Sequence, residues 1–183
     1  MGVELMPAAY AAQDLYKKIT AATFDVKNEW FFFDGAFNCS TNIQTSVNTW
    51  SHENFIAVYN NEIVAYFEGV WTRPLDIVSG FRTINFGGKY SRPFVQAVFR
   101  YVEHLFVNRS CKAFSWAVAL LNERATKQCE RFVRDYCGHR IGVRHHAQKS
   151  YSGKISDCCL YEITQEEFLE WKLRGYKKRA SAK

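Results

Sequence analysis

The chain has 183 residues, of which 48% are hydrophobic and 16% aromatic, and it carries a formal net charge of +6. A chain of this length can bury about 70% of its unfolded surface in one core, and this composition excludes an intrinsically disordered protein. No apolar run approaches the roughly 20 residues of a membrane-spanning helix. The six cysteines form no C-x-x-C pair and no framework spacing, so we expect reduced thiols in a cytosolic protein.

The first half of the chain predicts one helix and then a meander of short strands. Pro7 to Ala21 favours a helix, with proline near the first turn. Asn60-Asn61 separates two apolar runs and suits a tight turn, because asparagine tolerates left-handed backbone conformations. Four runs have the length and composition of strands: Trp30–Phe33, Phe55–Tyr59, Ile63–Trp71 and Phe81–Phe86.

A second helix is expected after Ser91, whose side chain can accept a hydrogen bond from an amide of the first turn. Pro93 falls in that turn, where its missing N–H costs nothing. The apolar residues that follow recur at helical spacing and predict a buried stripe. These residues are Phe94, Ala97, Val98, Tyr101, Val102 and Leu105.

The last third of the chain begins with a predicted strand and helix. Lys112 to Leu121 is an apolar run of strand length, and Asn122 after it can cap a helix. Apolar residues at helical spacing extend that helix over Glu123 to Tyr136. Gly138 is expected to end it, because glycine adopts the left-handed conformation without strain.

A hairpin and a final helix are expected next. Arg140–Ala147 and Ile155–Ile163 are two β-prone runs that meet across the polar turn Ser152-Gly153. Thr164 and Glu167 then stand three residues apart, as in a capping box, and predict the start of a helix. We expect a single domain over residues 1–171 and a basic tail over residues 172–183.

This order of elements, with particular residues at fixed spacings, resembles the GNAT acyltransferases, especially the branch that acetylates protein N-termini and antibiotics. The resemblance covers mainly the second half of the chain. The matching residues are Asn122, Ala125, Glu130, Phe132, Gly142, Arg144, Gly153, Asp157, Leu160, Tyr161, Ile163 and Glu166. It implies a mixed α+β (α/β) fold with a central mixed sheet, helices on both faces and splayed parallel strands at a cofactor cleft.

The resemblance also implies a cofactor, acetyl-CoA, held between the strand before Gly87 and the helix after it. In such proteins a Q/R-x-x-G-x-G/A loop presents backbone amides to the pyrophosphate at a helix N-terminus. Here Lys89 to Phe94 takes that place, so Arg92 replaces the first glycine, and Pro93 has no amide to donate. Lys89 and Arg92 could hold phosphates by charge instead, or they could be cations of a solvated helix start.

The same resemblance predicts where the pantetheine arm would lie. Strands Phe81–Phe86 and Lys112–Leu121 are connected through a helix, and such crossovers give parallel neighbours. We expect the two strands to splay near Asn85 and Asn122, leaving a gap for the arm. The expected cofactor-binding residues are therefore Asn85, Phe86, Lys89, Ser91, Arg92 and Asn122.

The candidate catalytic residues are Glu68 and Cys129. A transferase of this kind can use a carboxylate as general base and an acid for the leaving thiolate. Glu68, on the strand before Phe81–Phe86, is the nearest carboxylate, although an outward-facing strand glutamate is the commoner alternative. Cys129 stands where many GNAT proteins carry a tyrosine that acts as the general acid. It could donate a proton in the same way, or it could be a small core residue.

Positive charge gathers at the end of the chain. Residues 138–154 contain four lysines or arginines and three histidines without a carboxylate, and residues 172–183 are also basic. An acidic partner such as nucleic acid is one interpretation, and a solvated hairpin with a disordered tail is the other. Adjacent His145 and His146 should point to opposite faces of a strand, so no metal site is expected.

Two functions remain open from the sequence. The first is an acetyl-CoA-dependent N-acetyltransferase acting on an amine of a small molecule or protein. The second is a GNAT-like protein that has lost catalysis and serves as a binding or structural component. The short chain, the aromatic residues and the departed pyrophosphate loop also loosely resemble GNAT-like proteins of tailed bacteriophages, some of which are particle-associated. The interpretation of the chain as a nucleic-acid-binding GNAT relative rests on its positive charge alone.

Overall fold

The computed structural model describes residues 2–23, 48–87, 92–150 and 152–180. The strands in these ranges are β1 (Glu4–Pro7), β2 (His52–Tyr59), β3 (Glu62–Thr72), β4 (Ile77–Val78), β5 (Arg82–Asn85), β6 (Ala113–Ala119), β7 (His139–Lys149) and β8 (Ile155–Thr164). The helices are α1 (Ala12–Thr23), α2 (Arg92–Glu103), α3 (Glu123–Asp135) and α4 (Gln165–Ala180). Single turns flank two of them, a 3₁₀ turn at Ala8–Ala11 and a π-helical turn at His104–Asn108.

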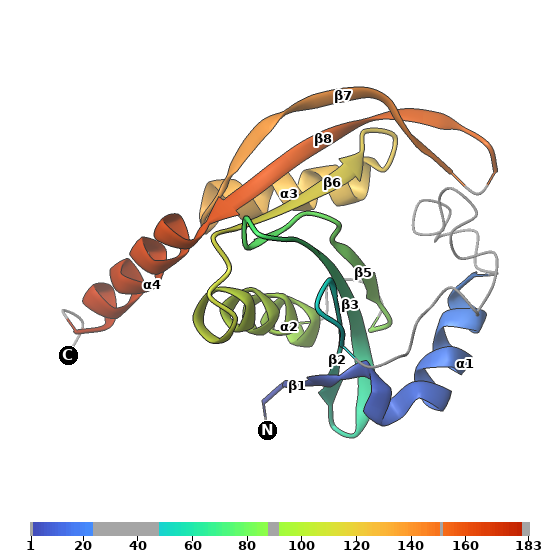
Figure 1. Cartoon of the computed structure of the whole chain (residues 1–183), viewed down its shortest axis with the longest axis horizontal. Helices are drawn as coiled ribbons and strands as arrows, with labels where there is room; N and C mark the ends of the chain where they lie inside the picture. The colour runs from blue at the N-terminus through green and yellow to red at the C-terminus, as the bar shows by residue number, and fades with distance from the viewer. Residues whose placement is uncertain (1, 24–47, 88–91, 151, 181–183) are drawn as a thin grey trace.

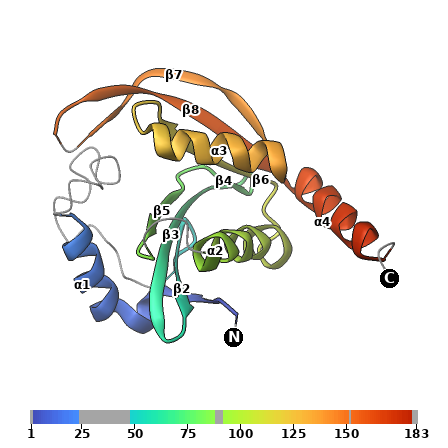
Figure 2. The ribbon, with the colours of Figure 1, turned by 180° about the vertical axis from the view of Figure 1, so that it is seen from behind.

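The strands form one mixed sheet in the order β1-β2-β3-β4-β6-β8-β7, and β5 pairs with β3 beside this path. Only β4 and β6 are parallel; the other described pairings are antiparallel. Helix α1 lies on one face of the sheet, and α2 and α3 lie on the other (Figure 1, Figure 2). The predicted mixed sheet with helices on both faces is confirmed.

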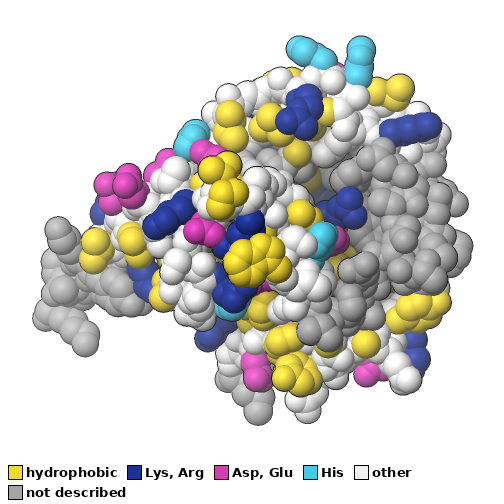
Figure 3. Space-filling model, viewed as in Figure 1, with side chains coloured by type: hydrophobic (Ala, Val, Ile, Leu, Met, Phe, Trp, Pro, Cys, Tyr) yellow, Lys and Arg dark blue, Asp and Glu magenta, His cyan; other side chains and the backbone are white. Residues whose placement is uncertain are grey.

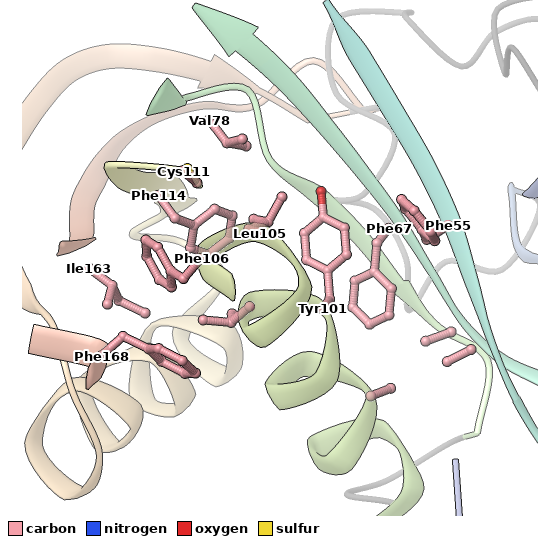
Figure 4. Close-up of a cluster of buried hydrophobic side chains, with 14 of the residues drawn as sticks. Phe55, Phe67, Val78, Tyr101, Leu105, Phe106, Cys111, Phe114, Ile163 and Phe168 are labelled. Carbon is pink, nitrogen blue, oxygen red and sulfur yellow. The ribbon is translucent and has the colours of Figure 1, made fainter. Parts of the chain in front are cut away.

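Two hydrophobic clusters identify the two faces. On the face covered by α2, Phe67 stacks on Tyr101 with ring centroids 5.0 Å apart, and Phe114 packs edge-on against Tyr101 at 6.3 Å (Figure 4). On the opposite face, α1 packs on the strands through a smaller cluster that includes Leu15, Ile19, Ile56, Tyr66 and Ile84. Because side chains alternate along a strand, these clusters show which face each strand residue occupies.

Predicted turns and caps are found within the described ranges, whereas Ser91, the predicted cap of α2, lies outside them. Asn60 and Asn61 have φ values of 51° and 62° and turn β2 into β3. The Asn122 side chain accepts a hydrogen bond from the Ala125 amide at 3.2 Å, so it caps α3 as expected. The capping box is reciprocal: the Glu167 amide donates to the Thr164 hydroxyl at 3.2 Å, and the Thr164 amide donates to the Glu167 carboxylate at 2.8 Å.

The prediction of a helix over Pro7 to Ala21 was wrong at its start. Pro7 is the last residue of β1 and pairs with Phe55 of β2, and α1 begins only at Ala12 after the 3₁₀ turn. β1 is an edge strand, where a proline that lacks an N–H is tolerated. The partner of Glu4–Pro7 is about 50 residues away in the chain, so local propensity gave no sign of this strand.

Strand Phe81–Phe86 and the strand before Asn122 are parallel neighbours as predicted, but a separate short strand makes the hydrogen-bonded pairing with β6. The parallel ladder to β6 is made by β4, which joins Ile77 to Ala113 and Val78 to Phe114. β5 pairs with β3 instead, from Arg82 to Asn85. β4 and β5 lie end to end on the same edge of β3, so β5 still runs in the direction of β6 with no third strand between them.

The C-terminal helix extends through the boundary expected at residue 172. α4 runs to Ala180, and Phe168, Trp171 and Lys172 contact the α2 side of the body through Phe106, Phe99 and Glu103. The predicted strand Trp30–Phe33 lies outside the described residues. Within the described ranges, each helix is too short or too polar to span a lipid bilayer.

Candidate functional site

A gap between β5 and β6 is the centre of the candidate site. Val78 pairs with Trp71 of β3 on one side and with Phe114 of β6 on the other. Beyond Val78 the chain continues along β3, whereas β6 pairs only with β8 among the described strands. The arm formed by β6, β8 and β7 leans away from β5 (Figure 1). We use the word gap for the stretch over which the described β5 and β6 are not paired, from Val78 toward Asn85 and Asn122.

The sheet presents Glu68 on the α1 face beside this gap. Glu68 pairs directly with Arg82 of β5, and Arg82 Nη1 lies 3.9 Å from Glu68 Oε2. Only 18% of the Glu68 side chain is exposed, and burial raises the pKa of this carboxyl, while the charges of Arg82 and His52 oppose the rise. A carboxylate with a raised pKa is a better general base than an exposed glutamate.

The opposite face of the gap carries Trp116 and Cys129. The indole Nε1–H of Trp116 donates a hydrogen bond to the Cys129 thiol at 3.3 Å, and Trp116 also packs edge-on against Phe132 of α3. Burial raises the pKa of Cys129 to about 11. A thiol with this pKa is a weak proton donor to a thiolate whose own thiol has a pKa near about 8.5.

Thr83 is a candidate residue that the sequence analysis missed. It lies in the middle of β5, opposite Phe67 and hence on the α2 face. Its hydroxyl oxygen is buried and has no hydrogen-bond partner in the described part of the chain. Buried polar atoms are rarely left unpaired without a reason. A lone threonine in a strand has no signature that would have singled it out in the sequence.

The expected cofactor-binding residues are distributed around the open end of the gap. Asn85 Oδ1 accepts a hydrogen bond from the Gly87 amide at 2.9 Å, and the Phe86 amide donates to the Val64 carbonyl at 3.0 Å. Arg92 is exposed and opens α2, and Asn122 opens α3. Lys89 and Ser91 lie outside the described residues.

These residues fit the arm of a coenzyme A thioester better than its phosphates. The gap, the two helix starts and the Thr83 hydroxyl, which has no partner among the described residues, suit an extended chain with amide groups that needs hydrogen-bond partners. At the phosphate end, the described part of the chain supplies the Arg92 cation, whereas Pro93 has no amide to offer.

His145 and His146 belong to the β7–β8 arm. Figure 3 shows histidine side chains projecting from the β7–β8 arm. His145 is 79% exposed, and its Nδ1 is 2.8 Å from Asp157, which also accepts a hydrogen bond from the His146 amide at 2.9 Å. The described residues include no group of three or more histidine, cysteine or acidic side chains that could hold a metal ion.

Comparison with known proteins gives a match in structure only. No protein family model matches the sequence, and no curated protein is similar enough in sequence to match. Among solved structures, Vibrio cholerae spermidine N-acetyltransferase in complex with CoA and spermine has a TM-score of 0.71 at 12% identity, over 91% of this chain and 98% of that chain.

Two further solved structures show the same likeness in fold. A chimera of the same Vibrio cholerae enzyme and hSSAT gives a TM-score of 0.72 at 13% identity, over 92% of this chain and 99% of that one. A GCN5-related N-acetyltransferase from Brucella melitensis gives 0.70 at 16% identity, over 94% and 80% of the two chains. At these identities the likeness concerns the arrangement of the chain. The protein therefore has the fold of the GCN5-related N-acetyltransferases, the GNAT fold.

Proposed function

We propose that the protein is an acetyl-CoA-dependent N-acetyltransferase that acts on an amine of a small molecule or protein. The observation that carries this proposal is the gap between β5 and β6, flanked by the half-buried carboxylate of Glu68 on one face and by Trp116 and Cys129 on the other. The likeness to acetyltransferase structures supports the same interpretation.

In this proposal, acetyl-CoA supplies an activated acyl thioester. The pantetheine arm lies in the gap, where Thr83 offers a hydrogen bond and the side chains of β6 exclude water from one side. Lys89 and Arg92 hold the phosphates by charge at the open end. This arrangement holds the thioester within the gap, between the two faces of the sheet, and the amine approaches from the α1 face, on which Glu68 stands.

Glu68 has the role of general base. It removes the proton of the attacking amine, directly or through one water molecule, as the C–N bond forms and the C–S bond breaks. Water would supply the proton of the leaving sulfur. We do not assign this proton to Cys129, because its pKa of about 11 makes the transfer uphill.

A binding or structural protein without catalysis is the second candidate. The specific observation in its favour is that Arg92 and Pro93 begin α2, because Pro93 lacks an amide and Arg92 carries a bulky side chain near the expected phosphate position. Such a protein would keep the fold and lose affinity for coenzyme A.

The experiment that separates the two candidates measures binding and turnover on one preparation. Titration calorimetry with acetyl-CoA and with CoA tests the cofactor. Thioester consumption is then followed with a panel of amines, including spermine and an N-terminal peptide. Binding with amine-dependent thioester loss supports the transferase. If no heat is detected at millimolar acetyl-CoA, the protein does not bind this cofactor, and the non-catalytic protein is the remaining candidate.

A further inference from the structure

The gap between β5 and β6 has a closed end and an open end. It is closed where Val78 pairs with both Trp71 and Phe114, and it opens toward Asn85 and Asn122. The exposed Arg92, the cation proposed for the phosphates, stands near the open end because α2 follows β5 in the chain. A nucleotide is too bulky to enter a gap between neighbouring strands. The arm must therefore enter with its thioester end first, toward the closed end.

Phe81 occupies the closed end of the gap. It lies in the link between β4 and β5, where the chain has just separated from β6. Its ring packs edge-on against Phe114 of β6 with centroids 4.8 Å apart, and it stacks on Tyr101 of α2 at 5.6 Å. A third contact, a stack on Phe67 of β3 at 6.2 Å, also holds the ring. Phe81 is nevertheless only half-buried, so part of its surface remains uncovered.

From this geometry we infer that Phe81 limits the length of the acyl chain that the protein accepts. The inference rests on the proposed transferase function, and it specifies which acyl-CoA thioesters that site accepts. The acyl group on the tip of the arm meets the Phe81 ring, which three elements of the core hold in place. An acetyl group is small enough to stop short of the ring, whereas a butyryl chain would have to displace it. Displacing a packed aromatic ring costs contacts that a longer chain does not restore.

The test compares acyl-CoA binding by titration calorimetry without any amine, so that it does not depend on turnover. CoA, acetyl-CoA and butyryl-CoA are titrated into the native protein, Phe81→Leu and Phe81→Ala. Phe99→Leu is the matched control, because Phe99 is also half-buried among aromatic rings but packs against α3 and α4. Phe81→Leu is included as the milder change, and a thermal melt of each variant confirms that it is folded.

The native protein should bind acetyl-CoA at least about tenfold more tightly than butyryl-CoA, the scale expected when a pocket is short by a methylene or two. Phe81→Ala should remove or reverse this preference, Phe81→Leu should weaken it, and Phe99→Leu should leave it unchanged. If folded Phe81 variants bind CoA and keep the native preference, the inference is overturned and the proposed function stands. If the native protein binds none of the three compounds, the proposed function fails as well. Binding that appears only in Phe81→Ala would mean that the ring fills the gap outright, which also overturns the inference.

Discussion

Glu68 and Arg82 are direct neighbours across β3 and β5, with Arg82 Nη1 3.9 Å from Glu68 Oε2. The arginine only partly offsets the burial of the carboxylate, because the pKa of Glu68 is raised in spite of this neighbour. The pair is therefore not a simple salt bridge that stabilises the sheet. It places a carboxylate of increased basicity beside the gap, and it makes the ionised state of Glu68 dependent on Arg82.

Glu68→Gln should abolish most of the activity with little effect on acetyl-CoA binding. Removal of a general base typically costs about 100-fold or more in rate. Glu62→Gln, at an exposed position on the same strand, is the matched control and should keep native activity. The measurement is kcat/KM for thioester consumption beside calorimetry with acetyl-CoA. Equal activity in the two variants would exclude Glu68 as the base.

The same substitution should increase stability at neutral pH. Because the folded protein raises the pKa of Glu68, the folded state binds this proton more tightly than the unfolded chain does. The carboxyl therefore contributes stability that is present below its unfolded pKa and is lost as the pH rises through its folded pKa. The difference in Tm between Glu68→Gln and the native protein should grow from about pH 4 to pH 7. A constant difference would contradict this linkage.

Arg82→Gln should move the acidic limb of the pH–rate profile to higher pH. Arg82 lowers the pKa of Glu68 against the effect of burial, so its loss leaves the carboxyl protonated over a wider range of pH. At low pH the variant should be slower than the native protein, and at alkaline pH the two rates should converge. Parallel profiles separated by a constant factor would instead indicate a structural role for Arg82. The measurement is kcat/KM with one amine across the pH range in which the protein remains folded.

Lys89→Ala and Arg92→Ala should weaken acetyl-CoA binding, and the loss should be larger at low salt. If the phosphates are held by exposed charges and not by backbone amides, salt screens the attraction over a Debye length of about 10 Å at 0.1 M. In calorimetry, the affinities of the native protein and the double variant should therefore differ at low salt and become similar at high salt. Arg100→Ala, on the exposed side of the same helix, is the control. Native affinity that does not change with salt would point to amide donors instead.

The second half of the fold could be predicted from the sequence because its signals are local. Asn122, Gly153 and the Thr164–Glu167 box each define a turn or a cap through contacts within a few residues. The first half was predicted less well, since β1 and β4 are short and depend on partners elsewhere in the chain. β4 has only two residues, too few for a periodic pattern, yet it is the strand that makes the parallel contact with β6.

The site could be predicted only in part for the same reason. Glu68 was identified because carboxylates near the gap are few, but its exposure and its raised pKa depend on the pairing of β3 with β5. Thr83 and Phe81 are ordinary strand residues in the sequence. Their significance comes from the point at which the chain leaves β6, and no local pattern marks that point.

Cys129→Ala distinguishes a proton donor from a core residue. We expect the core outcome: unfolding free energy lower by about 1 kcal/mol and unchanged turnover per folded molecule. The physical reasons are the burial of the thiol, its pKa of about 11 and the loss of the acceptor for the Trp116 N–H. A denaturant melt and an assay on the same preparations measure both quantities. Loss of turnover with an unshifted melt would identify Cys129 as the acid.

Gly138→Ala should destabilise the protein severely, whereas Gly142→Ala should be tolerated. Gly138 has φ of +94°, and a Cβ there would lie 2.6 Å from the Glu162 carbonyl oxygen and 2.7 Å from Ile163. Both atoms belong to β8, which is paired on both edges by β6 and β7, so the backbone cannot yield without breaking a ladder. A Cβ at Gly142 meets no atom within 4 Å, which makes it the matched control on the same strand pair.

We expect a loss of more than about 3 kcal/mol for Gly138→Ala, from strain and steric overlap together, and less than about 1 kcal/mol for Gly142→Ala. Denaturant melts of both variants measure the difference, and similar midpoints would show that the turn after α3 can relax without cost.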